Sequence, residues 1–463
     1  MDQELQPQDQ KQEAAYKERE VITVSDPAAA LVESSKGLAK FGGFGFIEKS
    51  VKGTQNLNPE NKARKKIFLT DATKKSERAA LKNALQIWTD ALSSSDNLAE
   101  IVNKAQEKAD SASTTIKKNL KKALEETKEL ESSWRSLQLF YKNTEKEKVK
   151  NITILNADLT EQLANLDDST FFDEVKEELN SVHDRLDLRK SYSIVAIPGY
   201  LGSNAVVEKW AKLAMETQVT LVTDYANEKS ADNLLTYFEG DNLTSGDIYK
   251  KNVVMACNWL VGRGKDQTVG EEEDVYVSPA AALAGNIYKT NLSQVAAGKK
   301  HGSLSEVSGV RLNLKKSELT QMEKLGLIPM VDEFGKVMAM SAKTLFNGDN
   351  IGHQTYSVVR VFDYISKVMK HFLNQRAFEN FDSETKAELR SQIVKFLDSV
   401  TGPGKLIEKF EILRFDRDPN QKDRVFIDVH MTPYFPGKTY VIGLDGQKGD
   451  DPNPKWAESV TQK

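Results

Sequence analysis

The sequence predicts an α/β protein with an N-terminal helical region, a central α/β domain, and a C-terminal domain that ends in strand arms. Three observations lead to this prediction. Apolar residues recur at helical spacing from about residue 70 to 142. From residue 151 onward, short runs rich in β-branched residues alternate with helical stretches, which indicates a layer of mostly parallel strands. The chain closes on two strand-like runs separated by prolines.

Composition limits the class of protein and its compartment. The chain has 463 residues, a net charge of −4 and a single cysteine, Cys257, so a disulfide within one chain is excluded. No apolar run approaches the roughly 20 residues that span a bilayer, and the N-terminus resembles no secretory signal. Acidic residues interleave with the basic ones, which argues against a nucleic-acid partner. We therefore expect a cytoplasmic protein that binds neither membrane nor nucleic acid.

Changes in pattern along the chain predict five regions. They are an N-terminal arm over 1–70 with a short strand from Val21 to Val24, a helical region over 71–145, an α/β domain over 146–300, a C-terminal domain over 301–435, and a strand arm with its tail over 436–463.

Two helical stripes define the helical region. Leu81, Leu85, Trp88 and Leu92 recur on one face of the first predicted helix. After the polar break "SSSD", a second apolar face is made by Leu120, Leu124, Leu130, Trp134 and Leu137. The lysine and glutamate residues between them are interpreted as a solvated surface.

The central strands are predicted from four apolar runs. The elements after them are predicted from the spacing of apolar residues and from helix-ending glycine and proline. The runs are "NITILNA" at 151–157, "SYSIVAIPG", "QVTLVTDYA" and "NVVMACNWLVG". A hairpin follows in "LIPMVDEFGKVMAM". An amphipathic helix then carries Val358 to Phe372, and another runs from Ser383 to "TGPGK", where Gly402 and Pro403 end it.

The closing strands pose a question about pairing. Residues 425–431 alternate as a half-buried strand, prolines interrupt, and Tyr440, Val441, Ile442 and Leu444 form a further strand with only a Gly/Asp/Pro-rich tail behind it. A lone strand leaves its backbone groups unpaired and invites a partner. The residues by themselves favour an edge hairpin within one chain, and pairing with another chain is the alternative.

The sequence contains no pattern that is typical of a catalytic or ligand-binding site. "NWLVGRGKD" and "TGPGK" lack the spacing of a phosphate loop. The five histidines are scattered, and Cys257 lies in an apolar strand where a structural thiol is expected. We therefore expect no cofactor, no metal and no catalytic residue. A structural or binding protein is favoured over an α/β enzyme with an unrecognised site.

Several segments in succession resemble one family. "LESSWRSLQLFYKN", followed by "ITILNADLTEQLANL" and "STFFDEVKEEL", resembles the large sheath subunit of type VI secretion systems, with its Trp-x-x-Leu motif on Trp134 and Leu137. "YVSPAAALAGNIYKT" is similar to a segment shared with phage tail sheaths, and the run from Val358 to Leu413 is similar to the C-terminal sheath domain. The resemblance covers about residues 130 to 444. Residues 1–75 and the basic segment before "SYSIVAIPG" depart from the common pattern, which indicates a divergent branch like the systems of Bacteroidetes.

The resemblance implies an α+β sheath fold and a structural role. Copies of the chain, each paired with a small sheath subunit, would form a helical sheath on a baseplate around an inner tube. Contraction would drive the tube and its effectors into a target cell, and an AAA+ unfoldase would disassemble the contracted form. The alternative is a tail sheath protein of a phage or phage-like injection particle, which usually has no small partner.

The resemblance also assigns roles to residues. Leu81, Leu85, Trp88, Leu92 and Trp134 would bind the small subunit, and Val21, Val24, Tyr440, Val441, Ile442 and Leu444 would lie in strand arms that pair between subunits. Lys386, Arg390, Lys395 and Lys405 would contact the inner tube.

Overall fold

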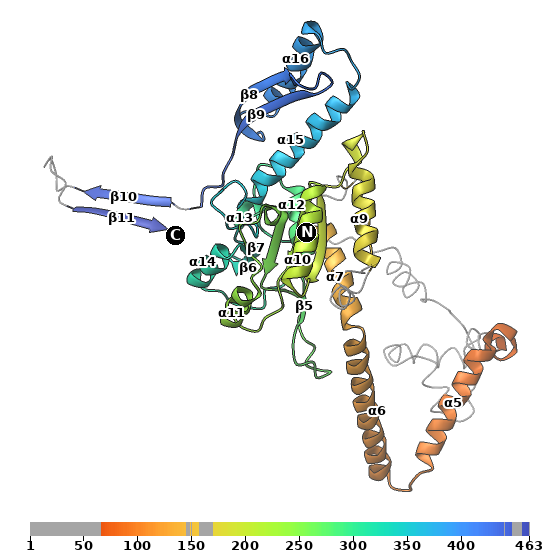
Figure 1. Cartoon of the computed structure of the whole chain (residues 1–463). Helices are drawn as coiled ribbons and strands as arrows, with labels where there is room; N and C mark the ends of the chain where they lie inside the picture. Colours follow the sequence, from red (N-terminus) through yellow and green to blue (C-terminus); the bar gives the residue numbers. More distant parts are fainter. Residues whose placement is uncertain are drawn as a thin grey trace, which may run out of the picture. The chain divides into compact units, whose positions relative to one another are not determined.

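The computed structural model of the chain describes residues 66–144, 149, 151–156, 170–438, 440–446 and 456–462 (Figure 1). It divides into two compact units, Met1–Thr115 and Ile116–Lys463. Among the helices of the described ranges, none is both long enough and apolar enough to cross a membrane.

The helical region contains three long helices. A 3-10 turn, Ala72–Lys74, leads into α5 (Lys75–Leu92), and α6 (Leu98–Glu126) and α7 (Lys128–Asn143) follow. Asp71 caps the 3-10 turn by accepting a hydrogen bond from the Thr73 amide at 2.8 Å. The helical prediction for residues 70–142 is confirmed, with one difference. Its second stretch is divided at Thr127 into α6 and α7.

The second unit is built on a five-stranded sheet with the order β1-β2-β3-β6-β7. Its strands are β1 (Ile194–Tyr200), β2 (Thr220–Asp224), β3 (Val253–Cys257), β6 (Leu327–Glu333) and β7 (Lys336–Ala339). The first four are parallel and β7 is antiparallel to β6, so the predicted α/β layer is confirmed. The sheet continues beyond residue 300, where the sequence suggested a boundary, because β6 pairs directly with β3.

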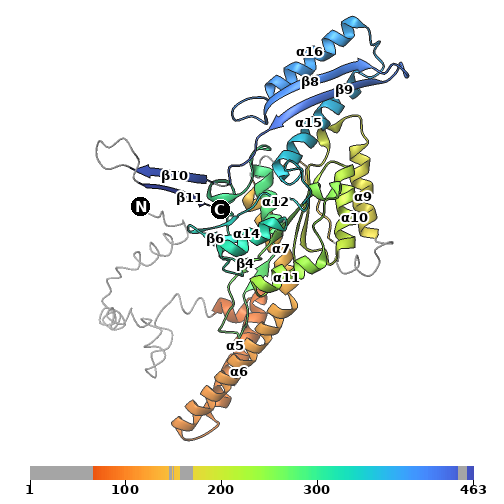
Figure 2. The ribbon, with the colours of Figure 1, turned by 60° about the vertical axis from the view of Figure 1, so that its left-hand side comes forward.

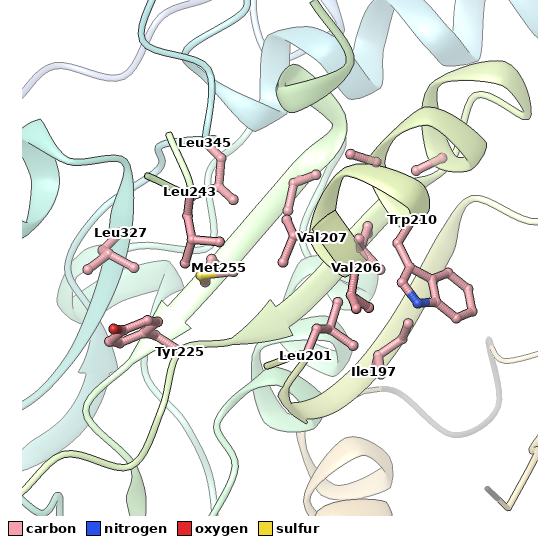
Figure 3. Close-up of a cluster of buried hydrophobic side chains, with 14 of the residues drawn as sticks. Ile197, Leu201, Val206, Val207, Trp210, Tyr225, Leu243, Met255, Leu327 and Leu345 are labelled. Atoms are coloured by element: carbon pink, nitrogen blue, oxygen red, sulfur yellow. The ribbon is translucent and has the colours of Figure 1, made fainter. Parts of the chain in front are cut away.

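Helices cover both faces of this sheet. One face packs against α9 (Thr170–His183), α10 (Asn204–Glu216), α11 (Ala231–Asp241) and α14 (Lys316–Lys324), and the other against α7 and α12 (Ala280–Lys289). Side chains alternate between the two cores along each strand: Leu221, Val253 and Met255 point to the first, Val222 and Val254 to the second. Figure 3 shows the first core, with Met255 beside Leu243 and Leu345.

The sheath-like segment "YVSPAAALAGNIYKT" becomes β5 (Val275–Val277) and the buried helix α12, and β5 pairs with β4 (Leu260–Arg263). Helix α12 also packs against α7. A Cβ atom at Gly285 would lie 2.5 Å from the carbonyl oxygen of Phe140, so glycine is required at this crossing of the two helices.

Asp224 fixes the start of α12 from a distance. Its buried carboxylate accepts hydrogen bonds from the amides of Gly199 at 2.9 Å and Ala280 at 2.8 Å, and from the Ser278 hydroxyl. Since Pro279 supplies no side-chain cap, Asp224 acts as the cap of α12 and ties it to the carboxyl ends of β1 and β2. Burial raises the pKa of Asp224 to about 7.

This raised pKa predicts a dependence of stability on pH. The folded chain binds the Asp224 proton up to about pH 7, whereas the unfolded chain releases it near pH 4, so stability falls as the pH rises through this window. From pH 6 to pH 8 the stability of the wild type relative to Asp224→Asn should fall by about 1.4 kcal/mol. Denaturant unfolding of both proteins at the two pH values measures this difference, and parallel curves would contradict it.

The C-terminal domain has its own core. Helices α15 (Tyr356–Gln375) and α16 (Ser383–Ser399) pack against a two-stranded ribbon, β8 (Ile407–Arg417) and β9 (Val425–Pro433) (Figure 2). The three buried residues of α16, Leu389, Ile393 and Leu397, recur at helical spacing. Both predicted helices and the alternating strand at 425–431 are confirmed.

Helix α15 joins this domain to the central sheet through a polar face. Val361 and Ile365 lie in the C-terminal core, whereas Arg360 and Lys367 are directed at the central domain. Arg360 donates to the Ile287 carbonyl at 3.2 Å and Lys367 to the Tyr192 carbonyl at 2.8 Å. Burial lowers the pKa of Lys367 to about 8. The two domains are thus joined in part by hydrogen bonds of buried charged side chains.

Candidate assembly surfaces

Apolar side chains line α5 and α6 without cover from the described chain. Leu81, Leu85 and Leu92 of α5 are 48, 57 and 59% exposed. The side chain of Trp88, on the same helix, is outside the described part of the structure. On α6, Val102, Ile116 and Leu120 are exposed as well. Exposed apolar residues in such a series mark a surface for another protein.

Helix α7 has one face in the core and one face in solvent. Leu139 is buried beside α12, whereas Leu130 and Trp134 are 72 and 57% exposed. Leu137 completes the exposed stripe, which follows the helical spacing i, i+4, i+7. The part of the predicted face from Leu130 to Leu137 therefore does not pack on the described part of its own chain. Leu139, which holds α7 on the central domain, was not identified from the sequence.

A charged network fixes the first turn of α7. Glu131 accepts hydrogen bonds from Arg135 at 2.9 Å and from Arg263 of β4 at 3.0 Å, and Arg263 also pairs with Glu271. The Arg263 guanidinium holds the pKa of Glu131 below its usual value. Since Arg263 follows Glu131 by 132 residues, no local sequence pattern reveals this pairing. The network orients α7 so that its Leu130–Trp134 face stays outward.

The closing strand does have a partner in its own chain. Tyr440, Val441, Ile442 and Leu444 lie on β10 (Tyr440–Gly446), which pairs antiparallel with β11 (Trp456–Gln462). The expectation that nothing follows to pair it is therefore wrong: residues 456–462 form that strand. Among the described strands, β10 and β11 pair with each other alone, and the four named side chains are exposed. The other proposed arm, Val21 and Val24, lies outside the described residues.

The run "NITILNA" is not a strand in its described part. Residues 151–156 form no regular element, and Ile152, Ile154 and Leu155 are exposed. The sequence prediction of a strand there is wrong, because a β-branched run needs a neighbouring strand to pair with and none of the described strands pairs with it. Thr153 is tied to Tyr192 by a hydrogen bond of 2.6 Å between their hydroxyls.

The four basic residues proposed for tube contact differ in their surroundings. Arg390 and Lys395 of α16 are exposed. Lys386 forms an ion pair with Asp416 at 2.5 Å, and Lys405 donates to the Asp398 carbonyl at 3.2 Å. Lys405 is exposed as well, but Arg390 and Lys395 take part in neither of these two contacts, so their charges are the more available to a partner.

Two features of the described residues concern metal binding and the single cysteine. Within those ranges, no three His, Cys, Asp or Glu side chains are grouped so that they could hold a metal ion. Cys257 is fully buried, and burial raises its pKa, so its thiol is protonated and inert at neutral pH.

Comparison with protein families gives three matches in consecutive parts of the chain. Residues 31–120 match the TssC/VipB-like N-terminal region, residues 122–347 the central domain of type VI secretion system TssC/VipB, and residues 355–462 the TssC/VipB-like C-terminal domain. The first match includes residues 31–75, although residues 1–75 were predicted to depart from the family pattern. No curated protein sequence matches the chain.

Three solved structures that are similar to part of this chain have TM-scores below 0.5. A chain of the anti-feeding prophage baseplate has 15% identity and a TM-score of 0.47, over 65% of this chain and 77% of that one. The contracted helical sheath of the same particle has 16% identity and a TM-score of 0.46, over 65% of this chain and 78% of that one. The contracted sheath complex of an extracellular contractile injection system, PVC, has 12% identity and a TM-score of 0.43, over 66% of this chain and 90% of that one.

The family assignment rests on the three domain matches, which follow one another along the chain in the order N-terminal, central and C-terminal. The chain therefore belongs to the TssC/VipB family, the contractile sheath subunits of type VI secretion systems.

Proposed function

We propose that this sheath subunit forms its building block with a smaller sheath protein, which covers the apolar surfaces of α5, α6 and α7. The observation that carries the proposal is the exposed series from Leu81 through Trp134. Burying a leucine side chain yields roughly 1.5–3 kcal/mol relative to leaving it exposed, so several leucines along three helices favour a helical partner strongly. Such a complex would act in the cytoplasm, as a structural component and not as an enzyme.

In this proposal the building blocks stack into a helical sheath around an inner tube, on a baseplate. The hairpin β10–β11 supports a role in the contacts between subunits, because a two-stranded hairpin with exposed apolar residues is only marginally stable alone. Strand addition at its edges would give such a contact main-chain hydrogen bonds. An AAA+ unfoldase would recycle the contracted form.

Co-expression of this chain with its proposed small sheath partner tests the proposed function. Electron microscopy should reveal tubes when both are present and no tubes from this chain alone. Tubes from this chain alone would instead support a single-component sheath of the phage type. A stable monomer that does not assemble even with the small sheath partner and the tube protein would contradict the assembly role. It would favour an α/β enzyme instead.

The tube contact gives a separate prediction. Arg390→Glu combined with Lys395→Glu should reduce tube-templated assembly, since both side chains are exposed and contacts that must be released are expected to be polar. Binding of the small subunit should stay unchanged. Negative-stain counting of sheaths formed on preassembled tubes measures the effect, with Lys336→Glu, an exposed lysine of β7 in the central domain, as the matched control. Equal sheath numbers for all variants would exclude this site.

A further inference from the structure

The exposed Trp134 side chain, which the proposed partner would cover, is in contact with Arg135 of its own chain. The Arg135 guanidinium carbon lies 5.9 Å from the centroid of the Trp134 ring, within the range of a cation–π contact. Trp134 itself is 57% exposed. The place at which Arg135 is held therefore bears directly on the orientation of the Trp134 ring.

Arg135 is fixed by two contacts of different kinds. Its guanidinium forms an ion pair with Glu131, one turn earlier on α7, at 2.8 Å, and donates a hydrogen bond to the Gly262 carbonyl of β4 at 2.9 Å. Gly262 leaves room for this approach, because a Cβ atom there would lie 2.4 Å from Val277 Cγ2 and 3.1 Å from Arg135 Cδ. Arg135 thus lies directly against the β4–β5 hairpin.

Arg263 of β4 holds the Glu131 carboxylate in turn. Its guanidinium donates to Glu131 at 3.0 and 3.3 Å and to Glu271 at 2.7 and 2.8 Å, so one planar group bridges two carboxylates. These hydrogen bonds lower the pKa of Glu131, and they lower the pKa of Glu271 to about 2, so both carboxylates are charged at neutral pH. The three side chains are at most 25% exposed, which limits the screening of their charges by salt.

A continuous series of contacts therefore leads from Arg263 to the Trp134 ring, through Glu131 and then Arg135. An aromatic anchor that is already oriented in the free protein binds more tightly than one that is ordered only on binding. The ordering of a single long side chain costs roughly two- to tenfold in affinity. A residue that orients the anchor can thus change the affinity without touching the partner.

We propose that Arg263 is a positioning residue for the contact with the small sheath subunit. Through Glu131 and Arg135 it holds the Trp134 ring in the orientation that the partner recognises. The proposal rests on the proposed function, because it requires a partner on α7. It gives Arg263 no contact of its own with that partner. The effect of Arg263 on binding must therefore disappear when the Trp134 ring is absent.

A double-mutant cycle with the full chain and the small sheath subunit tests the proposal. Arg263→Gln should weaken binding about fivefold. In a Trp134→Ala background the same change should weaken binding less than about twofold, because the ring that Arg263 positions has been removed. Arg263→Lys keeps the charge but loses the planar fork that bridges two carboxylates, so it should restore the affinity only in part.

Two further variants separate positioning from folding. Glu131→Gln removes the carboxylate charge at nearly constant shape and should show the same coupling to Trp134. Lys142→Gln is the matched control, because Lys142 forms an ion pair from the opposite end of α7, with Glu306 at 2.6 Å. It should leave the affinity for the small subunit unchanged. Thermal unfolding of each variant alone measures whether it is folded.

The outcomes distinguish the positioning role from the proposed function. Equal losses from Arg263→Gln in the wild type and in Trp134→Ala would overturn the positioning role, because Arg263 would then act independently of the ring. Wild-type affinity of a folded Arg263→Gln would overturn it as well. Both results would leave the proposed function standing, since the small subunit still binds. Failure of the wild type to bind the small subunit would overturn both.

Discussion

Removal of residues 438–463 is expected to abolish sheath formation while the rest of the chain stays folded. The described side chains of β10 belong to none of the three hydrophobic cores, and β10 and β11 pair with each other alone among the described strands. Their loss removes the contact between Lys438 and Glu323, while the strands of the five-stranded sheet and of the β8–β9 ribbon keep their pairing. Each hydrogen bond between strands contributes only about 1 kcal/mol, but repetition at every subunit makes the connection cooperative.

Three measurements check the truncation. Circular dichroism should report a melting temperature close to that of the full chain, and co-purification with the small subunit should persist. Negative-stain microscopy should then show no sheaths. A shorter deletion, of residues 456–463 alone, tests the hairpin itself, because it leaves β10 without its partner β11. Contractile sheaths of normal length from the longer truncation would mean that the hairpin is dispensable for assembly.

Trp134→Asp is expected to break the complex with the small subunit. The Trp134 side chain is exposed, so the change should cost the free chain little. In the complex it would place an unpaired charge in an apolar contact, which is unfavourable. Loss of a central tryptophan anchor typically weakens binding by about 2 kcal/mol or more, roughly thirtyfold.

The matched control for this prediction is Ser133→Asp, which adds the same charge to an exposed neighbouring position of α7. Affinity for the small subunit is measured by titration, and folding by thermal unfolding of each variant alone. We expect Ser133→Asp to bind nearly as the wild type does. Equal affinity of Trp134→Asp and the wild type would show that the partner does not use this face of α7.

Local patterns in the sequence determined most elements of the fold. The spacing of apolar residues and the presence of helix-ending residues act over only a few positions. They predict the helices between residues 70 and 142 and the helix that ends before Gly402. The parallel strands β2 and β3 were recognised because strands buried on both faces read as continuous apolar runs. The exposed residues of α5 and α7 were likewise visible as stripes, although the stripe alone could not distinguish a core face from a binding face.

Tertiary structure decided what depends on distant partners. The run at 151–157 has the residues of a strand but no strand beside its described part, whereas residues 456–462 form β11 because β10 is available to pair. The cap of α12 comes from Asp224, 56 residues before Ala280, and the orientation of α7 from Arg263. The spacing of apolar residues in the sequence indicates which face of a helix or strand is apolar. What covers that face depends on chain folding over long separations, and here on other chains as well.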